Sequence, residues 1–387
     1  MGEPVDIKGY TAPGFERVRD AFARNFDEDT ECPEVGAAFS VIHEGECVVD
    51  LYGGYADAAR TRPWSADTIV NTFSTTKGVG AICISVLEDL GQIDYQKSVA
   101  HYWPEFAVEG KQHITVATAL SHQGGLSGLR TPLKIDDLFD WDRITGLIAA
   151  AAPLWKPGSA AGYHAITWGF IAGELVRRVT GGTTLSTFLQ EEVAGPVDAQ
   201  YYIGTPESLF PSVAEMIAPR GEPVQTLAEM TEILQLTLGN PIIEAEVANR
   251  RDFQAAELAA LNGMGNARGI ARLYAPFASE GQYSGRQVLR PESIARAVAA
   301  QFVGVDMNLG TDVRWGAAGF FGNNPRNWYG PNVGAFGHSG WGGSMGYADP
   351  DARISVGYVP NQMDANLHGD PRSMRLVDAL YRSIEEL

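Results

Sequence analysis

The order of strand-like and helix-like segments is the feature that most constrains the fold of this chain of 387 residues. Residues 36–43 and 47–52 are rich in β-forming residues and flank Glu44-Gly45-Glu46, a pattern typical of a hairpin. Further strand candidates, separated by glycine-rich or Asp-Pro-Asp turns, lie towards the other end at residues 313–321, 334–337, 343–347 and 353–359. Both ends of the chain are therefore predicted to supply strands.

The remaining segments show the apolar spacing of helices. An amphipathic helix is predicted around Phe15, Val18, Phe22 and Phe26, and a final one over residues 373–387. Central helices are predicted at residues 79–90, 141–152, 166–180, 185–193 and 267–275, with a short one after Thr115. The economical solution is an α+β fold of the α/β-sandwich type. In it, one antiparallel sheet flanked by helices is built from both termini, and an all-helical domain is inserted between them.

This pattern predicts two domains with the functional site at their junction. Residues 1–70 and 285–387 are predicted to form a discontinuous α/β domain, and residues 71–284 a mainly helical one. Residues 205–255 contain several prolines and no clear period, so we expect a flap or a variable insertion there.

Charge and composition argue against several classes of partner. The formal net charge is −18 and no basic stripe occurs, so nucleic acid and anionic membranes are not expected as partners. No signal-like start is present, and no apolar run approaches the roughly 18 residues of a membrane span. We therefore expect a soluble, cytoplasmic protein. The three cysteines and seven histidines lack metal-binding spacings, so no metal or cofactor is expected, and the oligomeric state is left open.

The stretch Ser74-Thr75-Thr76-Lys77 places a serine three residues before a lysine, directly ahead of the predicted helix. Residues three apart on a helix share a face, so the hydroxyl and the amine are expected to meet. A serine becomes a good nucleophile when a base takes its proton, and a buried lysine can be that base because burial lowers its pKa. Taken alone, S-x-x-K also fits an exposed lysine on a helix.

Two later stretches add to this pattern. Residues 162–165 (Gly-Tyr-His-Ala) precede a predicted helix, and a tyrosine near a lysine can hold or relay a proton. Residues 336–343 (Phe-Gly-His-Ser-Gly-Trp-Gly-Gly) are rich in glycine, which lets backbone N–H groups approach a substrate closely. One such N–H, together with that of Ser74, can form an oxyanion hole. Taken singly, a core tyrosine and a glycine-rich hairpin explain these stretches equally well.

In combination, the three stretches resemble the serine β-lactamase and penicillin-binding protein superfamily, whose order is S-x-x-K, a Tyr- or Ser-based motif and then K-T-G on a strand. The spacing is similar to that of the class C branch. Supporting similarities lie at residues 120–126 (LSHQGGL), 155–158 (WKPG) and 265–272 (GNARGIAR), and the resemblance covers about residues 15–385.

The resemblance implies a role for each of these residues. Ser74 would be the nucleophile that accepts the acyl group, and Lys77 and Tyr163 would share the work of general base and general acid. The backbone N–H groups of Ser74 and Trp341 would bind the oxyanion. The substrate-binding residues would be Trp155, His338, Ser339, Gly340 and Trp341.

Two departures from the family pattern bear on the substrate. Ala165 stands where the β-lactamase Y-x-N motif has Asn, and His338 stands where K-T-G has a lysine that helps to hold the carboxylate of penicillins. Histidine is mostly neutral near pH 7, so both changes favour an uncharged ester. The pattern is similar to the β-lactamase-like carboxylesterases called family VIII. It predicts a serine carboxylesterase that hydrolyses small-molecule esters, short-chain ones by family behaviour, through an acyl-enzyme on Ser74.

Other functions fit the same residues. A β-lactamase, a D-amino-acid peptidase or amidase, and an acyltransferase would all keep the acyl-serine and change its partner. A non-catalytic scaffold would have no need for the intact Ser74, Lys77 and Tyr163. Residues 342–346 (Gly-Gly-Ser-Met-Gly) match the G-x-S-x-G elbow of α/β-hydrolases, but that motif needs a helix after the serine, and a strand is predicted there.

Overall fold

The computed structural model describes residues 5–220, 230–326, 328–366 and 369–387. Within these residues the largest element is a nine-stranded antiparallel sheet with the order β1-β3-β2-β14-β13-β12-β11-β10-β9. Its strands are β1 (Lys8–Thr11), β2 (Gly36–His43), β3 (Glu46–Gly54), β9 (Ala300–Val305), β10 (Asp312–Gly316), β11 (Phe321–Gly322), β12 (Phe336–Ser339), β13 (Met345–Asp349) and β14 (Ile354–Pro360). The predicted α+β fold, with one antiparallel sheet built from both termini, is confirmed.

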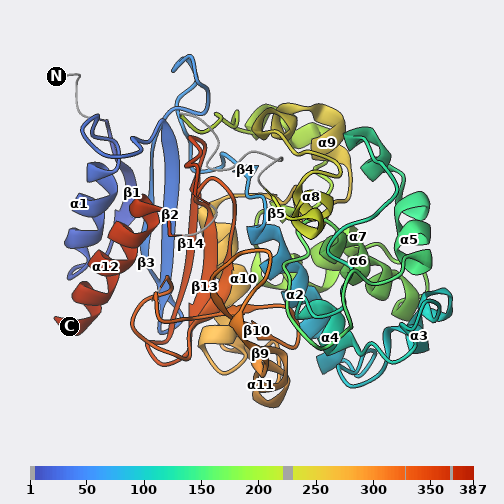
Figure 1. Ribbon diagram of the computed structural model, residues 1–387. Coiled ribbons are helices and arrows are strands. Elements are labelled where there is room, and N and C mark those ends of the chain that lie inside the picture. The colour runs from blue at the N-terminus through green and yellow to red at the C-terminus, as the bar shows by residue number, and fades with distance from the viewer. Residues whose placement is uncertain (1–4, 221–229, 327, 367–368) are drawn as a thin grey trace.

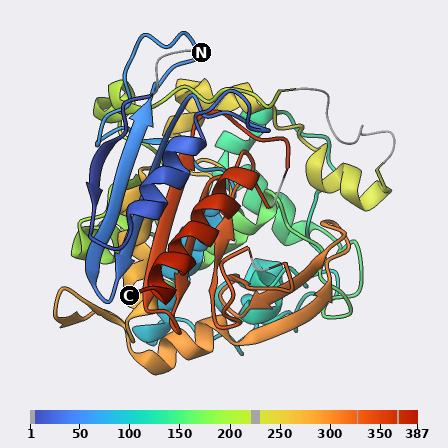
Figure 2. The same cartoon turned by 90° about the vertical axis from the view of Figure 1, so that its left-hand side faces the viewer.

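The centre of the sheet is covered on both faces. Helices α1 (Glu16–Arg24) and α12 (Pro371–Glu385) lie together on one face, and α10 (Ala267–Ala278) packs against β14, β13 and β2 on the other (Figures 1 and 2). Every residue of β14 is buried. A strand that is covered on both sides has a continuous apolar sequence rather than an alternating one, and Ile-Ser-Val-Gly-Tyr-Val-Pro in β14 largely follows this rule.

The part of the chain between the two sets of strands is mainly helical and lies beside the sheet (Figure 1). Its helices, with the one that precedes β9, are α2 (Thr75–Asp89), α3 (Val99–Tyr102), α4 (Val116–Leu120), α5 (Trp141–Ala150), α6 (Thr167–Val179), α7 (Leu185–Phe188), α8 (Glu232–Leu238), α9 (Arg251–Ala255) and α11 (Pro291–Val298). A small sheet, in the order β4 (Val70–Asn71), β6 (Met264–Gly265) and β5 (Tyr201–Tyr202), joins distant segments of this part. Strands of two residues are too short to leave a periodic pattern in the sequence.

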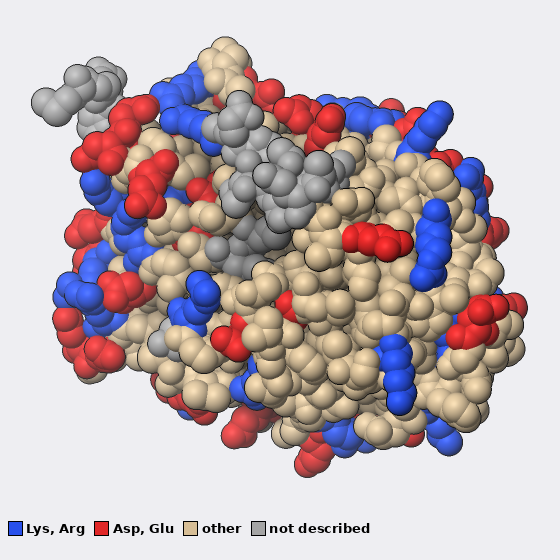
Figure 3. All heavy atoms as spheres, in the orientation of Figure 1, with Lys and Arg blue, Asp and Glu red and all other residues tan. Residues whose placement is uncertain are grey.

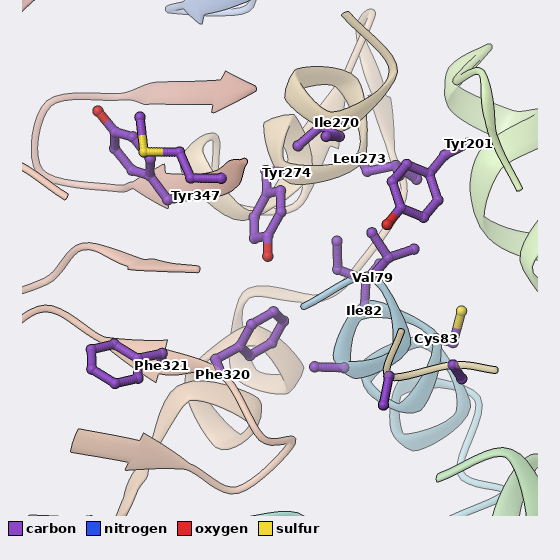
Figure 4. Close-up of a cluster of buried hydrophobic side chains, with 14 of the residues drawn as sticks. Val79, Ile82, Cys83, Tyr201, Ile270, Leu273, Tyr274, Phe320, Phe321 and Tyr347 are labelled. Carbon is purple, nitrogen blue, oxygen red and sulfur yellow. The ribbon is translucent and has the colours of Figure 1, made fainter. Parts of the chain in front are cut away.

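Helix α2 lies at the centre of the molecule. Its residues from Thr75 to Leu87 are all buried, and it packs against α6, α11 and β12. Figure 4 shows Val79 and Ile82 of α2 in one apolar cluster with Leu273 and Tyr274 of α10. Because α2 is enclosed in this way, its first turn has a fixed position between the sheet and the helical part.

The predicted division into residues 1–70 with 285–387 and residues 71–284 stays a prediction. Helix α10 lies within 71–284 in sequence, although it packs on the large sheet. Within 205–255, the described residues form short helices that include α8 and α9, and residues 221–229 lie outside the described part. None of the described helices has both the length and the apolar character that crossing a membrane requires.

Candidate active site

Ser74 stands at the first turn of α2, where the small strand β4 meets the helix. Phe73, immediately before it, has a φ of +41°, in the left-handed region that bulky residues rarely adopt. Asn71 holds this turn, because its Oδ1 accepts the Phe73 N–H at 2.8 Å. Ser74 is half-buried, whereas the other residues from 71 to 80 are buried. The strained turn therefore presents the serine side chain while its neighbours stay in the core.

The Lys77 amine lies next to the Ser74 hydroxyl, one turn along α2. Lys77 Nζ is 3.1 Å from Ser74 Oγ and hydrogen-bonds to the carbonyl oxygens of Ala165 at 2.8 Å and Ala260 at 3.0 Å. Lys77 is completely buried, and burial lowers its pKa well below the usual value for lysine. The two carbonyls come from segments far along the chain, so the tertiary fold determines the direction of the amine.

The two carbonyls also determine which part of the amine faces the serine. A carbonyl oxygen can only accept, so two hydrogens of Nζ point at Ala165 and Ala260. The remaining direction points at Ser74 Oγ. In the neutral amine that burial favours, this direction holds the lone pair, which can accept the proton of the Ser74 hydroxyl.

Tyr163 completes the group from the loop before α6. Its ring centre is 4.8 Å from Lys77 Nζ, and the ring stacks on Trp315 of β10 with centroids 6.0 Å apart. Burial raises the pKa of the Tyr163 phenol above its usual value, a hydrogen bond with Ser74 opposes this change, and the charge of Asp306 adds to it. Burial therefore favours a neutral phenol beside a neutral amine over a phenolate beside an ammonium.

The turn after β12 lies against the start of α2 from the sheet side. A Cβ on Gly340 would be 2.1 Å from the carbonyl oxygen of Thr72, so this close approach requires glycine. The ring of Trp341 packs on that of Phe73, with centroids 5.2 Å apart. The structure thus brings the third stretch identified in the sequence next to Ser74.

Ser344 fastens this turn to the helix and does not form a nucleophile elbow. Its hydroxyl donates to the Thr72 carbonyl oxygen at 2.8 Å and lies 2.9 Å from the hydroxyl of Thr75. Strand β13 follows it directly, and no helix begins there. The structure thus has after Ser344 the strand that the sequence predicts there.

His338, at the position of the lysine in the K-T-G motif, is buried in β12. Its Nδ1 is 2.7 Å from the carbonyl oxygen of Ser339, and its ring centre is 6.1 Å from that of Tyr163. His338 is completely buried, whereas Ser339 and Trp341 are half-buried. Among the predicted substrate-binding residues on this segment, Ser339 and Trp341 are therefore the accessible ones.

Trp155 lies beside the loop that carries Tyr163: its indole N–H donates to the Ala160 carbonyl oxygen at 3.1 Å. A Cβ on Gly162 would be 2.7 Å from the Trp155 ring and 2.8 Å from the Met307 side chain. Met307 is 44% exposed and contacts the same loop, because its N–H donates to the Ala161 carbonyl oxygen at 2.9 Å. Sequence reasoning missed Met307, because a single methionine after a strand belongs to no motif.

Two buried histidines connect the loops around the site. His164 Nε2 accepts the Leu126 N–H at 3.0 Å and its Nδ1 is 2.7 Å from the Gly162 carbonyl oxygen, so Nδ1 carries the proton. His122 Nδ1 accepts the His164 N–H at 3.0 Å. Burial lowers the pKa of both imidazoles, that of His164 to about 4. Both side chains are therefore neutral and structural.

Charged side chains are unevenly distributed on the face seen in Figure 1. Figure 3 shows them crowded around the end formed by the sheet and sparse over the middle of this face. In the described part of the chain, no group of three or more His, Cys, Asp or Glu side chains is arranged to hold a metal ion.

The antiparallel sheet, the helical part beside it, and the serine, lysine and tyrosine at their junction define a protein of the β-lactamase/transpeptidase fold class. The family model described as Beta-lactamase matches residues 22–380, and the chain belongs to this family. The family resemblance inferred from the sequence is confirmed.

Three relatives show how close the similarity is. A solved structure described as a family VIII carboxylesterase is 47% identical, covers 98% of this chain and 100% of its own, and has a TM-score of 0.92. A penicillin-binding protein homologue from Caulobacter crescentus is 41% identical, with the same coverage and a TM-score of 0.92. The protein named Esterase/beta-lactamase LipL, from Mycobacterium tuberculosis, is 36% identical over 344 residues, which are 85% of this chain and 77% of that protein.

Proposed function

We propose that this protein is a serine hydrolase that cleaves uncharged carboxylic esters through an acyl-enzyme on Ser74. The contact that carries the proposal is the 3.1 Å approach of Lys77 Nζ to Ser74 Oγ, in a buried setting where two carbonyl oxygens orient the amine. Similarity to a family VIII carboxylesterase and to a protein named as an esterase supports an ester as the substrate class.

In the acylation step, Ser74 Oγ attacks the ester carbonyl carbon while the neutral Lys77 amine takes the hydroxyl proton. The backbone N–H groups of Ser74 and Trp341 stabilise the negative oxygen of the tetrahedral intermediate. The Tyr163 phenol then gives its proton to the departing alkoxide and recovers one from Lys77. The ester C–O bond breaks, and the acyl group stays on Ser74.

In the deacylation step, a water molecule attacks the acyl carbon. The Lys77–Tyr163 pair takes a proton from this water, and Ser74 Oγ receives a proton as the acyl bond breaks. The products are the acid and the original enzyme. A neutral amine can accept a proton and a neutral phenol can donate one, so the neutral state of both side chains suits these transfers. It also leaves no buried unpaired charge on the pair in the resting enzyme.

The departures from the β-lactamase pattern support an uncharged substrate. The buried His338 brings no exposed cation to the turn after β12, so a substrate carboxylate has no partner there equivalent to the family's lysine. The half-buried Trp341 packs on Phe73 and so supplies an aromatic side chain next to Ser74, and the half-buried Trp155 lies beside the loop that carries Tyr163. Short acyl chains are proposed from the behaviour of the family. One relative is named both esterase and β-lactamase, which makes β-lactam hydrolysis the second candidate.

The test is turnover of p-nitrophenyl acetate and butyrate beside a chromogenic cephalosporin, for the wild type and for Ser74→Ala. We expect fast ester cleavage, slow or absent lactam cleavage, and a loss of at least about 10³-fold in the variant. The melting temperature of the variant should stay near that of the wild type, because the change removes one partly exposed hydroxyl. Full activity in Ser74→Ala would exclude an acyl-enzyme on Ser74. Dominant lactam cleavage would make β-lactams, rather than esters, the preferred substrates.

A fluorophosphonate probe separates a catalyst from a scaffold on the same fold. The wild type should be labelled at Ser74, and Ser74→Ala should not be labelled. If Ser74 is labelled but unlabelled protein hydrolyses no ester, transfer of the acyl group from an added ester to an added alcohol would instead identify an acyltransferase.

A further inference from the structure

Asp306 is a completely buried carboxylate in the turn between β9 and β10. Its Oδ1 accepts the backbone N–H groups of Tyr163 at 3.0 Å, Asn308 at 2.9 Å and Leu309 at 3.0 Å, and its Oδ2 accepts the Trp315 indole N–H at 3.2 Å. All four partners are uncharged donors. A carboxyl group that only accepts hydrogen bonds is in its ionised form, since a protonated one would need an acceptor.

The bonds of Asp306 hold Tyr163 from several directions. Asp306 binds the Tyr163 N–H, and Asn308, which Asp306 also holds, donates its side-chain N–H to the Tyr163 carbonyl oxygen at 3.1 Å. The Trp315 ring, fixed by its indole bond to Asp306, stacks on the Tyr163 ring with an angle of 13° between the planes. The backbone and the ring of Tyr163 therefore both depend on one carboxylate.

Asp306 is one of a small number of titratable side chains near the Tyr163 phenol. The described titratable side chains near the Tyr163 ring are Lys77 from α2, His338 from β12, His122 from the loop after α4, Tyr329 from the loop before β12, and Asp306 itself. Burial lowers the pKa of Lys77 and of His122, which favours their neutral forms. The negative charge of Asp306 makes ionisation of the nearby phenol harder.

We propose that Asp306 is a positioning residue for Tyr163, which fixes the ring beside Lys77 and keeps the phenolic proton in place for transfer to the departing alcohol. This inference rests on the proposed function, because it takes Tyr163 as the general acid. It assigns a role to a residue that lies more than 140 positions from Tyr163 and in none of the three sequence motifs.

The leaving group of the ester provides the sharpest test. Ethoxide must be protonated as it leaves, whereas p-nitrophenolate is stable without a proton, so only the first depends strongly on a general acid. Both esters form the same butyryl-enzyme, so the comparison uses kcat/KM, which reports acylation alone. In Asp306→Asn we expect kcat/KM for ethyl butyrate to fall by about 10²-fold and kcat/KM for p-nitrophenyl butyrate to fall far less. Tyr163→Phe should likewise slow the ethyl ester more than the p-nitrophenyl ester. The Asp306→Asn/Tyr163→Phe protein should be no slower than Tyr163→Phe alone. Equal losses on both esters, or additive losses in the double variant, would overturn the proposal.

A matched control is Asp349→Asn. Asp349 is also a completely buried carboxylate, and it accepts the backbone N–H groups of Asp351 and Ala352 at the far end of β13. Its loss should lower the melting temperature without changing the ratio of the two ester rates. A changed ratio in this control would show that the ratio reports general weakening of the fold, and would count against the role of Asp306.

Asn at position 306 has one acceptor oxygen, so its amide N–H₂ would face the Trp315 indole N–H. If Asp306→Asn fails to fold, Asp306→Asn with Trp315→Phe removes this conflict and is expected to show the same preference between esters. Trp315→Phe alone keeps the charge and removes one donor, and should show a smaller loss. The same rates in Trp315→Phe and in the Asp306→Asn/Trp315→Phe protein would contradict a role for the charge of Asp306.

A measurement without turnover separates this proposal from the proposed function. In protein with ¹³C-labelled tyrosine, the Tyr163 signal, assigned with Tyr163→Phe, should titrate at lower pH in the Asp306→Asn protein than in the wild type. If the wild type cleaves no ester, the proposed function fails, and this titration still decides whether Asp306 controls the Tyr163 proton. An unchanged titration would refute the inference even in an active esterase.

Discussion

At the scale of single residues, the sequence predicts the pairs that helix geometry brings together and misses those that only the fold brings together. Ser74 and Lys77 are three positions apart on one helix, so their contact follows from spacing. The carbonyl oxygens of Ala165 and Ala260, which aim the Lys77 amine, belong to residues 88 and 183 positions away. Asp306 left no signal in the sequence, because it binds mainly backbone N–H groups, which almost every residue has.

The protonation state of Lys77 predicts how kcat/KM falls at low pH. Because burial lowers its pKa well below the usual value, the amine loses its proton at a lower pH than an exposed lysine, and kcat/KM for p-nitrophenyl butyrate should fall only when acid protonates it. Activity should then persist up to the pH at which Tyr163 ionises, which lies above the usual range of a phenol. The measurement is kcat/KM across this range, corrected for uncatalysed hydrolysis.

Lys77→Arg tests whether the Lys77 amine is the base that takes the Ser74 proton. Arginine stays protonated at every accessible pH, so it cannot take the Ser74 proton, and we expect a loss of about 10²–10⁴-fold. A Lys77→Arg protein that keeps the wild-type rate and profile would exclude the amine as the base.

At the scale of elements, the long, periodic segments were predicted well and the short ones were not. Thr115 and Asn266 stand directly before two of the predicted helices and cap their N-termini, since their side chains accept the N–H groups of Thr118 and Gly269. The strand predicted over 313–321 is instead two strands, β10 and β11, separated by a buried turn. Gly319, with a φ of +99°, makes this turn possible, and β-forming neighbours conceal it in the sequence.

The turn after β12 provides a prediction at this scale. Gly343 has a φ of +108°, and a Cβ there would be 2.1 Å from a carboxylate oxygen of Asp370, so Gly343→Ala must shift the turn that carries Trp341. We expect a loss of about 3 kcal/mol in the free energy of unfolding and a reduced kcat, because the Trp341 N–H is displaced.

Gly181→Ala is the matched control for this variant. Gly181 also has a positive φ, +72°, but nothing lies within 4 Å of the added Cβ. It should lose about 1 kcal/mol from backbone strain alone and keep kcat. Urea unfolding of both variants measures the loss in the free energy of unfolding, and turnover of p-nitrophenyl butyrate measures the change in kcat. Equal effects in the two proteins would mean that the contact with Asp370 has no importance.

At the scale of the whole molecule, a buried ionic group joins the two ends of the chain. Arg372, at the start of α12, binds Glu34 at 2.9 Å and Asp370 at 2.6 Å, and it donates to the Gly342 carbonyl oxygen at 3.0 Å. All three charged residues are buried. Sequence reasoning did not find this group, because charged residues are usually exposed and no spacing connects positions 34 and 372.

This group predicts how stability depends on pH. One cation lies between two carboxylates, and burial raises the pKa of Glu34 from 4.5 to about 7. The folded protein therefore holds this proton more tightly than the unfolded chain does. The stabilisation is present below pH 4.5 and is lost as the pH rises through about 7. From this group alone, the free energy of unfolding should be lower at pH 8.5 than in acid by at most about 3 kcal/mol.

Glu34→Gln removes the titration and keeps the shape of the side chain. Urea unfolding at pH 5.5 and pH 8.5 should show a smaller change for the variant than for the wild type, and the difference between the two changes isolates Glu34. Identical pH dependence in the two proteins would show that Glu34 stays ionised throughout this range.

The strand order also has a consequence for synthesis of the protein on the ribosome. Strand β2 takes its central place only when β14 pairs with it, and the Gly36 N–H is bonded to an Asn361 side chain 325 residues later. During translation the hairpin of β2 and β3 must therefore wait, with one edge unpaired, while the helical part emerges and folds. An unpaired edge can bind the strand of another chain. A transcript that ends before β14 is thus expected to yield insoluble aggregates rather than a smaller active enzyme.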